Sequence, residues 1–338
     1  MDFETIAVWH RVQYPLMQGQ DWAKLCYQSE FGAGHMIADQ AACRQRLYEE
    51  YESTPASAAP LFERVGGGLR RLHLGPLHRE GIRLEVVAKL FELAAHPRGS
   101  QEGLEKKLRQ VETPETASYF EGYRQDGCPA VSHSQIYRQA YHPAYRLVPQ
   151  WAQCYWQLIK AIDRMMGEKD RIIVAIDGMS GSGKSTLGAH LQALFGGNLL
   201  HMDDFFLPVE KKTPHRLSQP GGNVDHERFK AEVLKPLKVG ETFSFRPFDC
   251  CKGCLGEAVT IEPQPLTIIE GCYSLHPALE MGYDLRVFLK LEPQEQSRRI
   301  LERNGRALHE RFIQVWIPLE NAYFEAFDVE KSCQMVFK

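Results

Sequence analysis

The spacing of apolar residues divides the chain into two parts with different patterns. Over the first 165 residues, apolar side chains recur three or four positions apart, which is typical of amphipathic helices. Leu84, Val87, Ala88 and Phe91 form one such stripe. The segments that carry the pattern are 21–31, 36–53, 81–96, 100–111 and 151–166. They predict a mostly α-helical domain over residues 1–165.

From residue 171 onward, short apolar runs rich in branched residues alternate with helical patterns. The apolar runs are 171–177, 198–202, 266–270, 285–291 and 333–337, and the helical patterns are 184–195, 225–238 and 294–327. Such alternation favours right-handed βαβ crossovers, in which consecutive strands lie parallel. We therefore expect an α/β domain over residues 168–338, with a mainly parallel five-stranded sheet and helices on both faces.

Length and charge narrow the classes of partner. At 338 residues the chain exceeds what one hydrophobic core usually organises. Lys and Arg number 40 against 43 Asp and Glu, so the net charge of −3 gives no electrostatic case for binding nucleic acid. The first ten residues lack a basic region before an apolar core, and no run approaches the roughly 20 apolar residues that span a bilayer. We expect a cytoplasmic protein that binds a small molecule, and an assembly of identical copies is compatible with these features.

The nine cysteines form an odd, scattered set, which is typical of reduced thiols in a cytosol. Only residues 250–254, with the sequence CCKGC, are clustered. Cys251 and Cys254 have the spacing of a zinc or redox pair, but no second ligand pair follows at the spacing of a zinc finger. We therefore favour unligated cysteines over a metal site.

Two segments of the first part are candidates for ligand binding. Residues 66–68 are three glycines, but no lysine follows them, so they predict a flexible turn rather than a phosphate loop. Residues 130–149 are dense in His, Tyr and Arg, which line anion pockets but also cover half-buried helices, and we favour the second interpretation. A weaker alternative is that this half is catalytic or binds the substrate through His133, Tyr137, Arg138, Tyr141 and Arg146.

The strongest chemical motif follows the first strand of the second part. The sequence GMSGSGKST, residues 178–186, satisfies the phosphate-loop pattern G-x-x-x-x-G-K-[ST]. Its glycines let backbone amides turn toward phosphate oxygens, and the next helix adds unpaired N–H groups. An apolar strand precedes the motif and a helix with a leucine stripe follows it, which is the context a nucleotide site requires. The residues expected to contact the nucleotide are Gly178, Ser180, Gly181, Ser182, Gly183, Lys184, Ser185 and Thr186.

Acidic residues end two other strands of the second part. Asp203 and Asp204 follow the strand at 198–202, and Glu270 ends the strand at 266–270. An Asp pair behind an apolar run is often only a turn, and Glu270 is open to the same plain interpretation. However, ligands of open α/β sheets bind at the carboxyl ends of the strands, where the phosphate loop also lies. A carboxylate there can orient an attacking hydroxyl and accept its proton, or hold the water shell of a metal ion.

Arginines gather near the end of the chain, at positions 298, 299, 303 and 306. Arg299 and Arg303 fall on one helical face. A mobile arginine helix can neutralise charge on a transferred phosphoryl group, although helical arginines are also common on plain surfaces.

Taken in order, these motifs resemble the uridine kinase and phosphoribulokinase-like branch of P-loop kinases. IVAIDGMSGSGKSTL resembles its phosphate loop, and HMDDFFLP resembles the second-strand motif of its nicotinamide riboside kinases. GGNVDHERF (221–229) resembles the Asp-His segment that meets the ribose in uridine kinases. IIEG resembles the strand with a magnesium-associated acid, and RRILERNGR resembles the arginine lid. The resemblance covers roughly residues 170 to 330.

The resemblance implies a kinase that uses ATP and Mg²⁺ to phosphorylate a hydroxyl of a small, nucleoside-like acceptor that carries a ribose. The residues carried over are Asp203, Lys184, Arg299 and Arg303 for catalysis, Asp203, Asp225 and His226 for the acceptor, and Ser185, Asp204 and Glu270 for the metal. Asp203 is the acid expected to face the acceptor hydroxyl.

The sequence also departs from this family. Residues 245–257 stand where uridine kinases carry an aromatic and histidine segment for the pyrimidine, and no matching histidine is present. The arginine segment is one residue longer than usual. The alternative function is a nucleotide-dependent switch that hydrolyses the nucleotide and signals to the helical part. Such proteins usually have an acid for the metal ion at the end of a strand, and Glu270 can take that role. The pair Asp203 and Asp225 argues against it, since a switch needs no acid facing a sugar.

Overall fold

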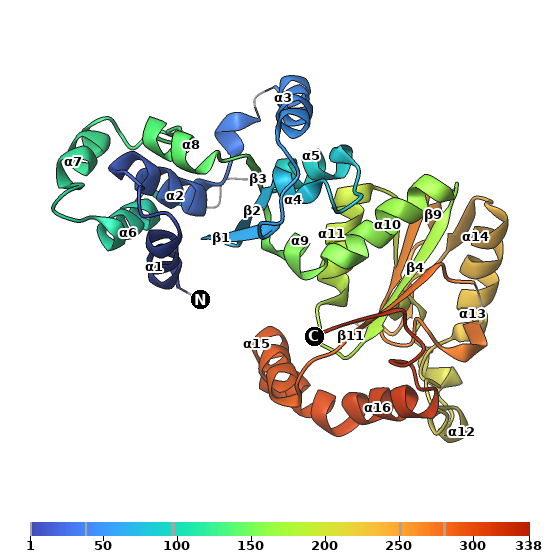
Figure 1. Ribbon diagram of the computed structural model, residues 1–338. Coiled ribbons are helices and arrows are strands. Elements are labelled where there is room, and N and C mark those ends of the chain that lie inside the picture. The colour runs from blue at the N-terminus through green and yellow to red at the C-terminus, as the bar shows by residue number, and fades with distance from the viewer. Residues whose placement is uncertain (1, 38, 96–98, 250–251, 280–281) are drawn as a thin grey trace. The chain divides into compact units, whose positions relative to one another are not determined.

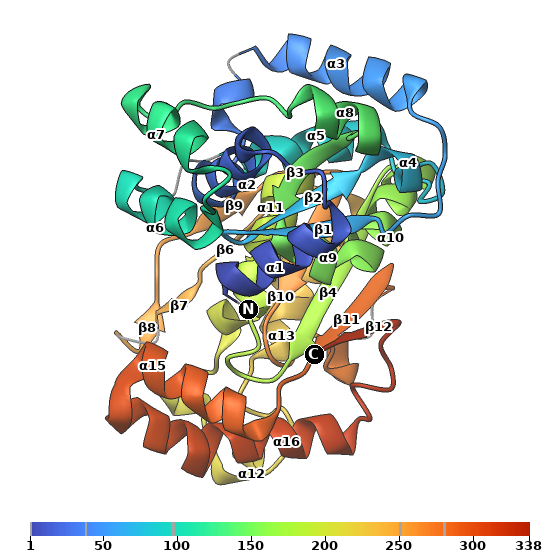
Figure 2. The same cartoon turned by 60° about the vertical axis from the view of Figure 1, so that its left-hand side comes forward.

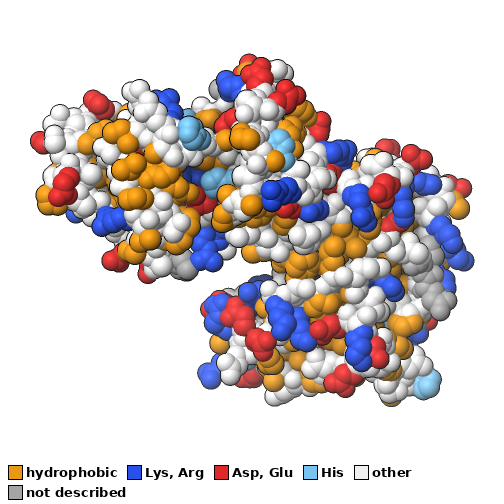
Figure 3. Space-filling model, viewed as in Figure 1, with side chains coloured by type: hydrophobic (Ala, Val, Ile, Leu, Met, Phe, Trp, Pro, Cys, Tyr) orange, Lys and Arg blue, Asp and Glu red, His pale blue; other side chains and the backbone are white. Residues whose placement is uncertain are grey.

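The computed structural model describes residues 2–37, 39–95, 99–249, 252–279 and 282–338. The chain separates into two compact units, Met1–Arg164 and Met165–Lys338, shown in Figure 1. Each unit has a hydrophobic core of its own. Blue and red side chains are interspersed over both units in the view of Figure 3, as the nearly balanced composition leads one to expect.

The first unit is mainly helical, and helices occupy each of the predicted segments. Their bounds are α1 (Phe3–Gln13), α2 (Gly19–Phe31), α3 (Gln40–Ser53), α4 (Leu74–Leu77), α5 (Leu84–Leu93), α6 (Gln101–Val111), α7 (Ala117–Gln125), α8 (Gln135–Tyr141), α9 (Gln150–Cys154) and α10 (Trp156–Glu168), with a 3₁₀ turn at Gly34–Met36. Trp22, Leu25, Phe91 and Phe120 are among the buried residues of its core.

The first unit also contains a small antiparallel sheet that the helical pattern did not predict. It consists of β1 (Phe62–Gly66), β2 (Leu69–His73) and β3 (Tyr145–Pro149) in the order β1-β2-β3. Of the three glycines, Gly66 ends β1 and the other two form the turn between β1 and β2, as expected. The strands escaped notice because charged residues, notably Glu63 and Arg71, are buried in them and remove the usual alternation of polar and apolar positions.

The second unit is built on a five-stranded parallel sheet, which confirms the expected fold class. Its strands are β4 (Ile172–Gly178), β5 (Asn198–His201), β10 (Leu266–Glu270), β11 (Leu285–Leu289) and β12 (Met335–Phe337). Their order is β12-β11-β4-β10-β5, and Figure 2 shows β12, β11, β4 and β10 side by side. Figure 1 shows α11 on one side of this sheet and α14 on the other.

The helices of the second unit are more interrupted than the sequence pattern predicted. Their bounds are α11 (Lys184–Phe195), α12 (Pro214–Leu217), α13 (His226–Phe229), α14 (Lys235–Val239), α15 (Pro293–Arg311) and α16 (Ile317–Ala326), with π-helical stretches at Lys230–Leu234 and Phe312–Trp316 and 3₁₀ turns at Met202–Phe205, Val209–Lys211 and Pro277–Leu279. The predicted helix over 294–327 is therefore two helices, and α15 itself is kinked at Gly305, where φ is +74°. Glycine allows this kink because it tolerates positive φ.

Four short strands lie outside the main sheet. β6 (Phe243–Phe245) pairs antiparallel with β9 (Val259–Ile261), and β7 (Phe248–Asp249) pairs antiparallel with β8 (Cys254–Leu255). Cys250 and Cys251 lie outside the described residues, so the predicted absence of metal at CCKGC stays a prediction. Within the part of the chain that the structure describes, no helix has the length and apolar character needed to cross a bilayer.

Candidate active site

The phosphate-loop motif forms a tight turn between the central strand β4 and helix α11. Gly178 has φ +138°, and a Cβ atom added there would lie 2.1 Å from the carbonyl oxygen of Leu289. Gly181 and Gly183 also have positive φ, at +77° and +95°. Only glycine tolerates this backbone path without strain. The sequence therefore dictates the loop conformation at these positions.

One side of the loop is open and offers hydrogen-bond donors. A Cβ atom added at Gly183 would meet no atom within 4 Å. Ser185 and Thr186 are exposed in the first turn of α11, whose first amides have no partner within the helix. The buried Ser182 hydroxyl has no hydrogen-bond partner among the described residues. This set of unpaired donors beside open space fits a phosphate group.

Lys184 is buried against the loop that it follows. Its Nζ donates to the carbonyl oxygen of Gly178 at 2.7 Å and to that of Met179 at 3.1 Å. An ammonium group has three hydrogens, so one remains for a further acceptor. The ammonium group of Lys184 therefore lies at the loop, and no acidic side chain among the described residues accepts a hydrogen bond from it.

Glu320 of α16 holds the loop from the other side, and sequence reasoning did not find it. Its carboxylate accepts hydrogen bonds from the Ser180 amide at 3.1 Å and from the Ser180 hydroxyl at 2.5 Å. Burial raises the pKa of Glu320, although the charge of Lys184 and the two bonds from Ser180 oppose the rise. Nothing in the helical pattern of 294–327 distinguishes this glutamate from surface acids.

The helix α15 also contacts the loop. Gln296 Nε2 donates to the Ser180 carbonyl oxygen at 3.0 Å, and Arg299 Nη1 lies 3.5 Å from the Gly181 carbonyl oxygen. Arg299 is also paired with Glu295, at 2.6 Å. Arg303 instead donates to Asn304 at 2.9 Å and is exposed. Of the two arginines predicted to form the lid, the structure brings Arg299 against the phosphate loop.

Asp177, the residue before the motif, fixes the base of the loop. It is fully buried and accepts hydrogen bonds from the amides of Gly178 at 2.7 Å and Leu275 at 3.0 Å, and from the Tyr323 hydroxyl at 2.8 Å. Burial raises the pKa of Asp177, and these donors work against the rise. An acid at the end of the apolar run IIVAID was the signal available in the sequence.

The predicted acids lie at the same edge of the sheet as the phosphate loop. β10, which ends in Glu270, lies between β4 and β5, and Asp203 and Asp204 follow β5 in a 3₁₀ turn. Glu270 stands opposite His201 in the parallel register. His201 Nδ1 and Glu270 Oε1 are 2.5 Å apart. Sequence reasoning passed over His201, although it directly precedes MDD.

These groups influence one another's protonation. The protein atoms that surround Asp203 raise its pKa, and Glu270 and Asp204 add to the rise, whereas Lys184 opposes it. Because Asp203 keeps an exposed face, solvent limits this rise. Burial likewise raises the pKa of Asp204. The hydrogen bond to Glu270 raises the pKa of His201.

Asp203 and Asp204 differ from the other acids in their hydrogen bonds. Among the described residues, no donor is paired with either carboxylate, and the charge of Lys184 acts on Asp203. Asp225 is buried, caps α13 through the Arg228 amide at 3.1 Å and pairs with Lys211 at 2.8 Å. The carboxylate of Asp203 is therefore open to an incoming ligand, whereas that of Asp225 is already occupied.

The structure places Asp225 and His226 beside the Asp203 segment. The Asp225 amide donates to the Phe205 carbonyl oxygen at 2.8 Å, so the two segments run next to each other. The His226 ring stacks on that of His276, with 4.7 Å between centroids, and lies 3.1 Å from Arg216 Nη2. Burial lowers the pKa of His226. This backbone hydrogen bond joins the two segments, and no contact between the Asp203 and Asp225 carboxylates is present among the described residues.

The residues predicted to hold a metal ion do not form a closed cage. Among the described residues, no group of three or more His, Cys, Asp or Glu side chains is arranged to hold a metal. Magnesium usually takes one or two carboxylates together with waters and substrate phosphates, so it does not require such a cage. Glu270 and Asp204 are close enough to influence each other electrostatically, and the Ser185 hydroxyl is exposed at the loop.

Comparison with known proteins gives likeness of fold. No protein-family model matches the chain. A possible uridine kinase from Bacillus stearothermophilus is 20% identical with a TM-score of 0.39, covering 54% of this chain and 100% of its own. D-glycerate 3-kinase from Cryptococcus neoformans var. grubii is 16% identical with a TM-score of 0.36, covering 51% and 88%. Deoxyadenosine kinase from M. mycoides with bound dATP is 16% identical with a TM-score of 0.25, covering 50% and 91%.

These matches cover about half of the chain. At such low sequence identities and TM-scores, they carry no argument about activity. The second unit has a P-loop kinase-type fold on the strength of its own strand order and phosphate loop.

Proposed function

We propose that this protein is a kinase that transfers the γ-phosphoryl group of ATP to a hydroxyl of a small, ribose-bearing acceptor. One observation carries the proposal. The phosphate loop after β4 and the open carboxylate of Asp203 after β5 lie at one edge of the sheet, with Glu270 of β10 between them. A phosphoryl donor and a hydroxyl acceptor need these two groups on opposite sides of the transferred phosphate.

The donor side rests on the phosphate loop. The loop amides and the unpaired Ser182 hydroxyl can bind phosphate oxygens, and the third hydrogen of Lys184 can point to them. Arg299, which already reaches the Gly181 carbonyl, can approach the same oxygens from α15. Because the transition state of phosphoryl transfer is loose, positioning and neutralisation of charge supply most of the catalysis.

A metal ion would bind at the edge of the sheet where the phosphate loop lies. A magnesium ion, when bound, would neutralise the phosphates and lower the barrier by stabilising developing charge. Ser185, Glu270 and Asp204 are the residues that would hold it. His201 would keep Glu270 oriented through their hydrogen bond.

The acceptor side rests on Asp203. A raised pKa brings a carboxylate closer to the range in which it can accept a proton from a hydroxyl. Asp225 and His226 lie in the segment beside it and would contact the acceptor sugar. Since Asp225 is held by Lys211, the acceptor would have to replace or share that ion pair.

Acceptor-dependent release of ADP tests the proposal. The full chain is incubated with Mg²⁺ and either ATP or GTP, and nucleosides, vitamin-like alcohols and sugars are added one at a time. We expect release of the nucleoside diphosphate, ADP or GDP, only with an acceptor, together with a phosphorylated product. Hydrolysis at the same rate without any acceptor would instead support a nucleotide-dependent switch and overturn the kinase assignment.

A further inference from the structure

The first unit contains a pocket that the proposed function does not use. Its volume is about 390 Å³, and its lining comes from α2, from α8 and from the segments on either side of α8. The lining residues are Lys24, Ser132, His133, Arg138, His142 and Pro143. The backbone before α8 is tied to α2, because Gln20 donates to the Ser132 carbonyl oxygen at 2.8 Å. A volume of this size accommodates a small ligand.

The lining is basic and contains no acid. Lys24 donates to the Val131 carbonyl oxygen at 3.1 Å, which leaves two of its hydrogens for another acceptor. Burial lowers the pKa of Lys24 to about 8, and the charges of Arg71 and Arg138 add to this fall, so the amine stays mostly protonated near pH 7. Arg138 is exposed and has no ion-pair partner among the described residues. Two cations thus face one pocket and repel each other.

The acid nearest to these cations is engaged elsewhere. Asp21 is fully buried beneath the pocket, and its two oxygens accept four hydrogen bonds. The donors are the Gln18 amide, the Ser134 amide, the Ser134 hydroxyl and His133 Nδ1. With its lone pairs occupied in this way, Asp21 moderates the charge of Lys24 but does not pair with it.

His133 forms a rigid floor rather than a source of charge. Its ring stacks on Tyr137 with 4.1 Å between centroids, and its Nε2 lies 2.7 Å from the Tyr145 hydroxyl. Burial lowers the pKa of His133 to about 4, so the ring is neutral near pH 7. A fixed floor beside two cations is an arrangement that suits a compact anion.

The backbone at the rim is unusual as well. His142 ends α8 in the left-handed region with φ +44°, and Pro143 follows it. Such a conformation is uncommon for histidine and persists where the surrounding structure imposes it. The His142 side chain joins Lys24 and Arg138 in a lining that contains no acidic residue.

We propose that this pocket binds the phosphate group of a small phosphomonoester, with Lys24 and Arg138 as its charged ligands. A dianion compensates both cations, whereas a monocarboxylate would leave one of them unpaired. His142 and Ser132 supply further donors, and His133 and Pro143 bound the space for the ester group. The site belongs to the first unit alone and is independent of the phosphate loop.

The test must separate this pocket from the phosphate loop, which also binds phosphate. We therefore propose to titrate the full chain, carrying ¹³C-labelled histidine, with inorganic phosphate and with methyl phosphate, and to follow the ring signals by NMR. The His142 signal is assigned with the His142→Gln variant. A saturable shift of this signal is expected with both probes, and no saturable shift is expected with acetate.

Arg138→Ala is the decisive variant, and Arg46→Ala is its matched control. Arg46 is an exposed arginine of α3, so its replacement removes the same charge from the same unit. Removing a charged hydrogen bond weakens binding by roughly tenfold or more, which we expect for Arg138→Ala and for Lys24→Gln but not for Arg46→Ala. The proposal is overturned if the His142 signal does not saturate with either phosphate, if Arg138→Ala binds as tightly as Arg46→Ala, or if acetate binds equally well.

Discussion

Their hydrogen-bond partners distinguish the acids of the candidate site. His201 is paired with Glu270 at 2.5 Å, and Asp225 is held by Lys211 and the Arg228 amide. The carboxylates of Asp203 and Asp204 have no such donor among the described residues, but the charge of Lys184 acts on Asp203, whereas those of His201 and Arg228 act on Asp204. At the scale of the residue, Asp203 is therefore the acid with the capacity to bind and deprotonate a hydroxyl.

Asp203→Asn should abolish most of the turnover while leaving the fold intact. A positioned base contributes typically 10²–10⁴-fold, so kcat for acceptor-dependent ADP release should fall by about that factor. Lys184→Ala should also abolish turnover. Both variants should keep the fold, which an unchanged far-ultraviolet circular dichroism spectrum would show.

Asp225→Ala provides the contrast. This change removes a helix cap and an ion pair, so it should lower the free energy of unfolding by about 1–2 kcal/mol. Asp203→Ala should not, because its carboxylate makes no comparable bond. Near-normal activity of Asp203→Asn would remove Asp203 from the reaction.

At the scale of the element, the phosphate loop depends on both its glycines and its neighbours. Asp177 secures the base of the loop, and Glu320 of α16 secures Ser180 in its middle. Gly178 and Gly183 have different surroundings, however. The first is pressed against Leu289, whereas the second borders open space. The two glycines therefore have separable roles in folding and in binding.

Gly178→Ala should destabilise the second unit, and Gly183→Ala should mainly weaken nucleotide binding. A Cβ atom at Gly178 would lie 2.1 Å from a backbone oxygen, so strand β11 or the loop must move. At Gly183 the cost is the strain of positive φ, of order 1–3 kcal/mol, and the new methyl group would enter the space beside the loop.

Thermal unfolding and titration with a fluorescent ATP analogue measure these two effects. We expect a clearly lower Tm for Gly178→Ala than for Gly183→Ala. For Gly183→Ala, we expect weaker binding than its Tm would explain. Equal Tm values for the two variants would contradict the difference in packing.

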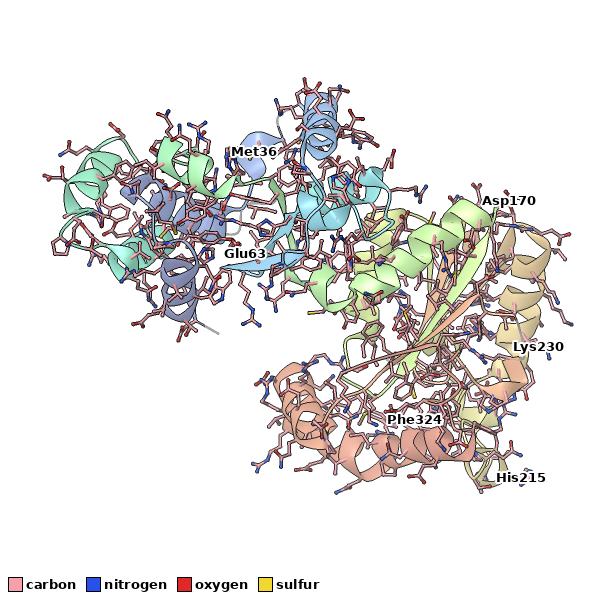
Figure 4. All side chains as sticks on the ribbon, viewed as in Figure 1. Met36, Glu63, Asp170, His215, Lys230 and Phe324 are labelled. Carbon is pink, nitrogen blue, oxygen red and sulfur yellow. The ribbon has the colours of Figure 1, made fainter. Side chains whose placement is uncertain are left out.

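At the scale of the whole molecule, the two units are stabilised in different ways. The second unit has an apolar sheet core, whereas the first buries a charged network behind its small sheet. Arg71 donates to Glu63 at 2.7 Å, and Glu63, labelled in Figure 4, also accepts a bond from Tyr14. His10 lies 3.8 Å from Glu63, and its buried Nδ1 has no partner among the described residues.

The first unit should lose stability as the pH falls from about 6.5 to about 4. Burial lowers the pKa values of His10 and His133 to about 4, from an ordinary value of 6.5. Between these values the unfolded chain binds protons that the folded unit does not, so protonation favours unfolding. Each histidine can cost up to about 3 kcal/mol by this linkage.

Tryptophan fluorescence follows this change, because Trp9, Trp22, Trp151 and Trp156 lie in the first unit and only Trp316 lies in the second. Denaturant titrations between pH 7 and pH 4 should give a steadily lower free energy of unfolding. In the variant His133→Gln, which cannot be protonated, the slope with pH should be smaller. An unchanged slope would show that His133 titrates normally in the folded unit.

Residues 165–338 should fold and bind nucleotide when expressed alone. Asp177, Glu320 and Gln296, which hold the phosphate loop by hydrogen bonds, all belong to the second unit, and so does its hydrophobic core. We expect cooperative thermal unfolding and an affinity for the ATP analogue similar to that of the full chain. An unfolded fragment, or one that binds no nucleotide, would show that the first unit completes the site.

Local patterns determined the main strands and the phosphate loop of the second unit, but not the breaks in its helices or the short strands β6 to β9. Five apolar runs gave five parallel strands, and the glycine and lysine spacing of residues 178–186 gave the loop, because both depend on neighbours in sequence. The same reasoning missed the small sheet of the first unit. Its buried charges are tolerable only in pairs, and the partners Glu63 and Arg71 come together through the pairing of β1 with β2.

The tertiary structure decided which distant groups meet. Placing β10 between β4 and β5 sets Glu270 beside His201, and folding α16 back brings Glu320 to Ser180, 140 positions away in the chain. It also gathered Lys24 and Arg138 around one pocket. No local pattern encodes such meetings, since they depend on the packing of whole elements. The sequence by itself therefore determined the phosphate loop and its strand, and only the tertiary structure decided which side chains surround it.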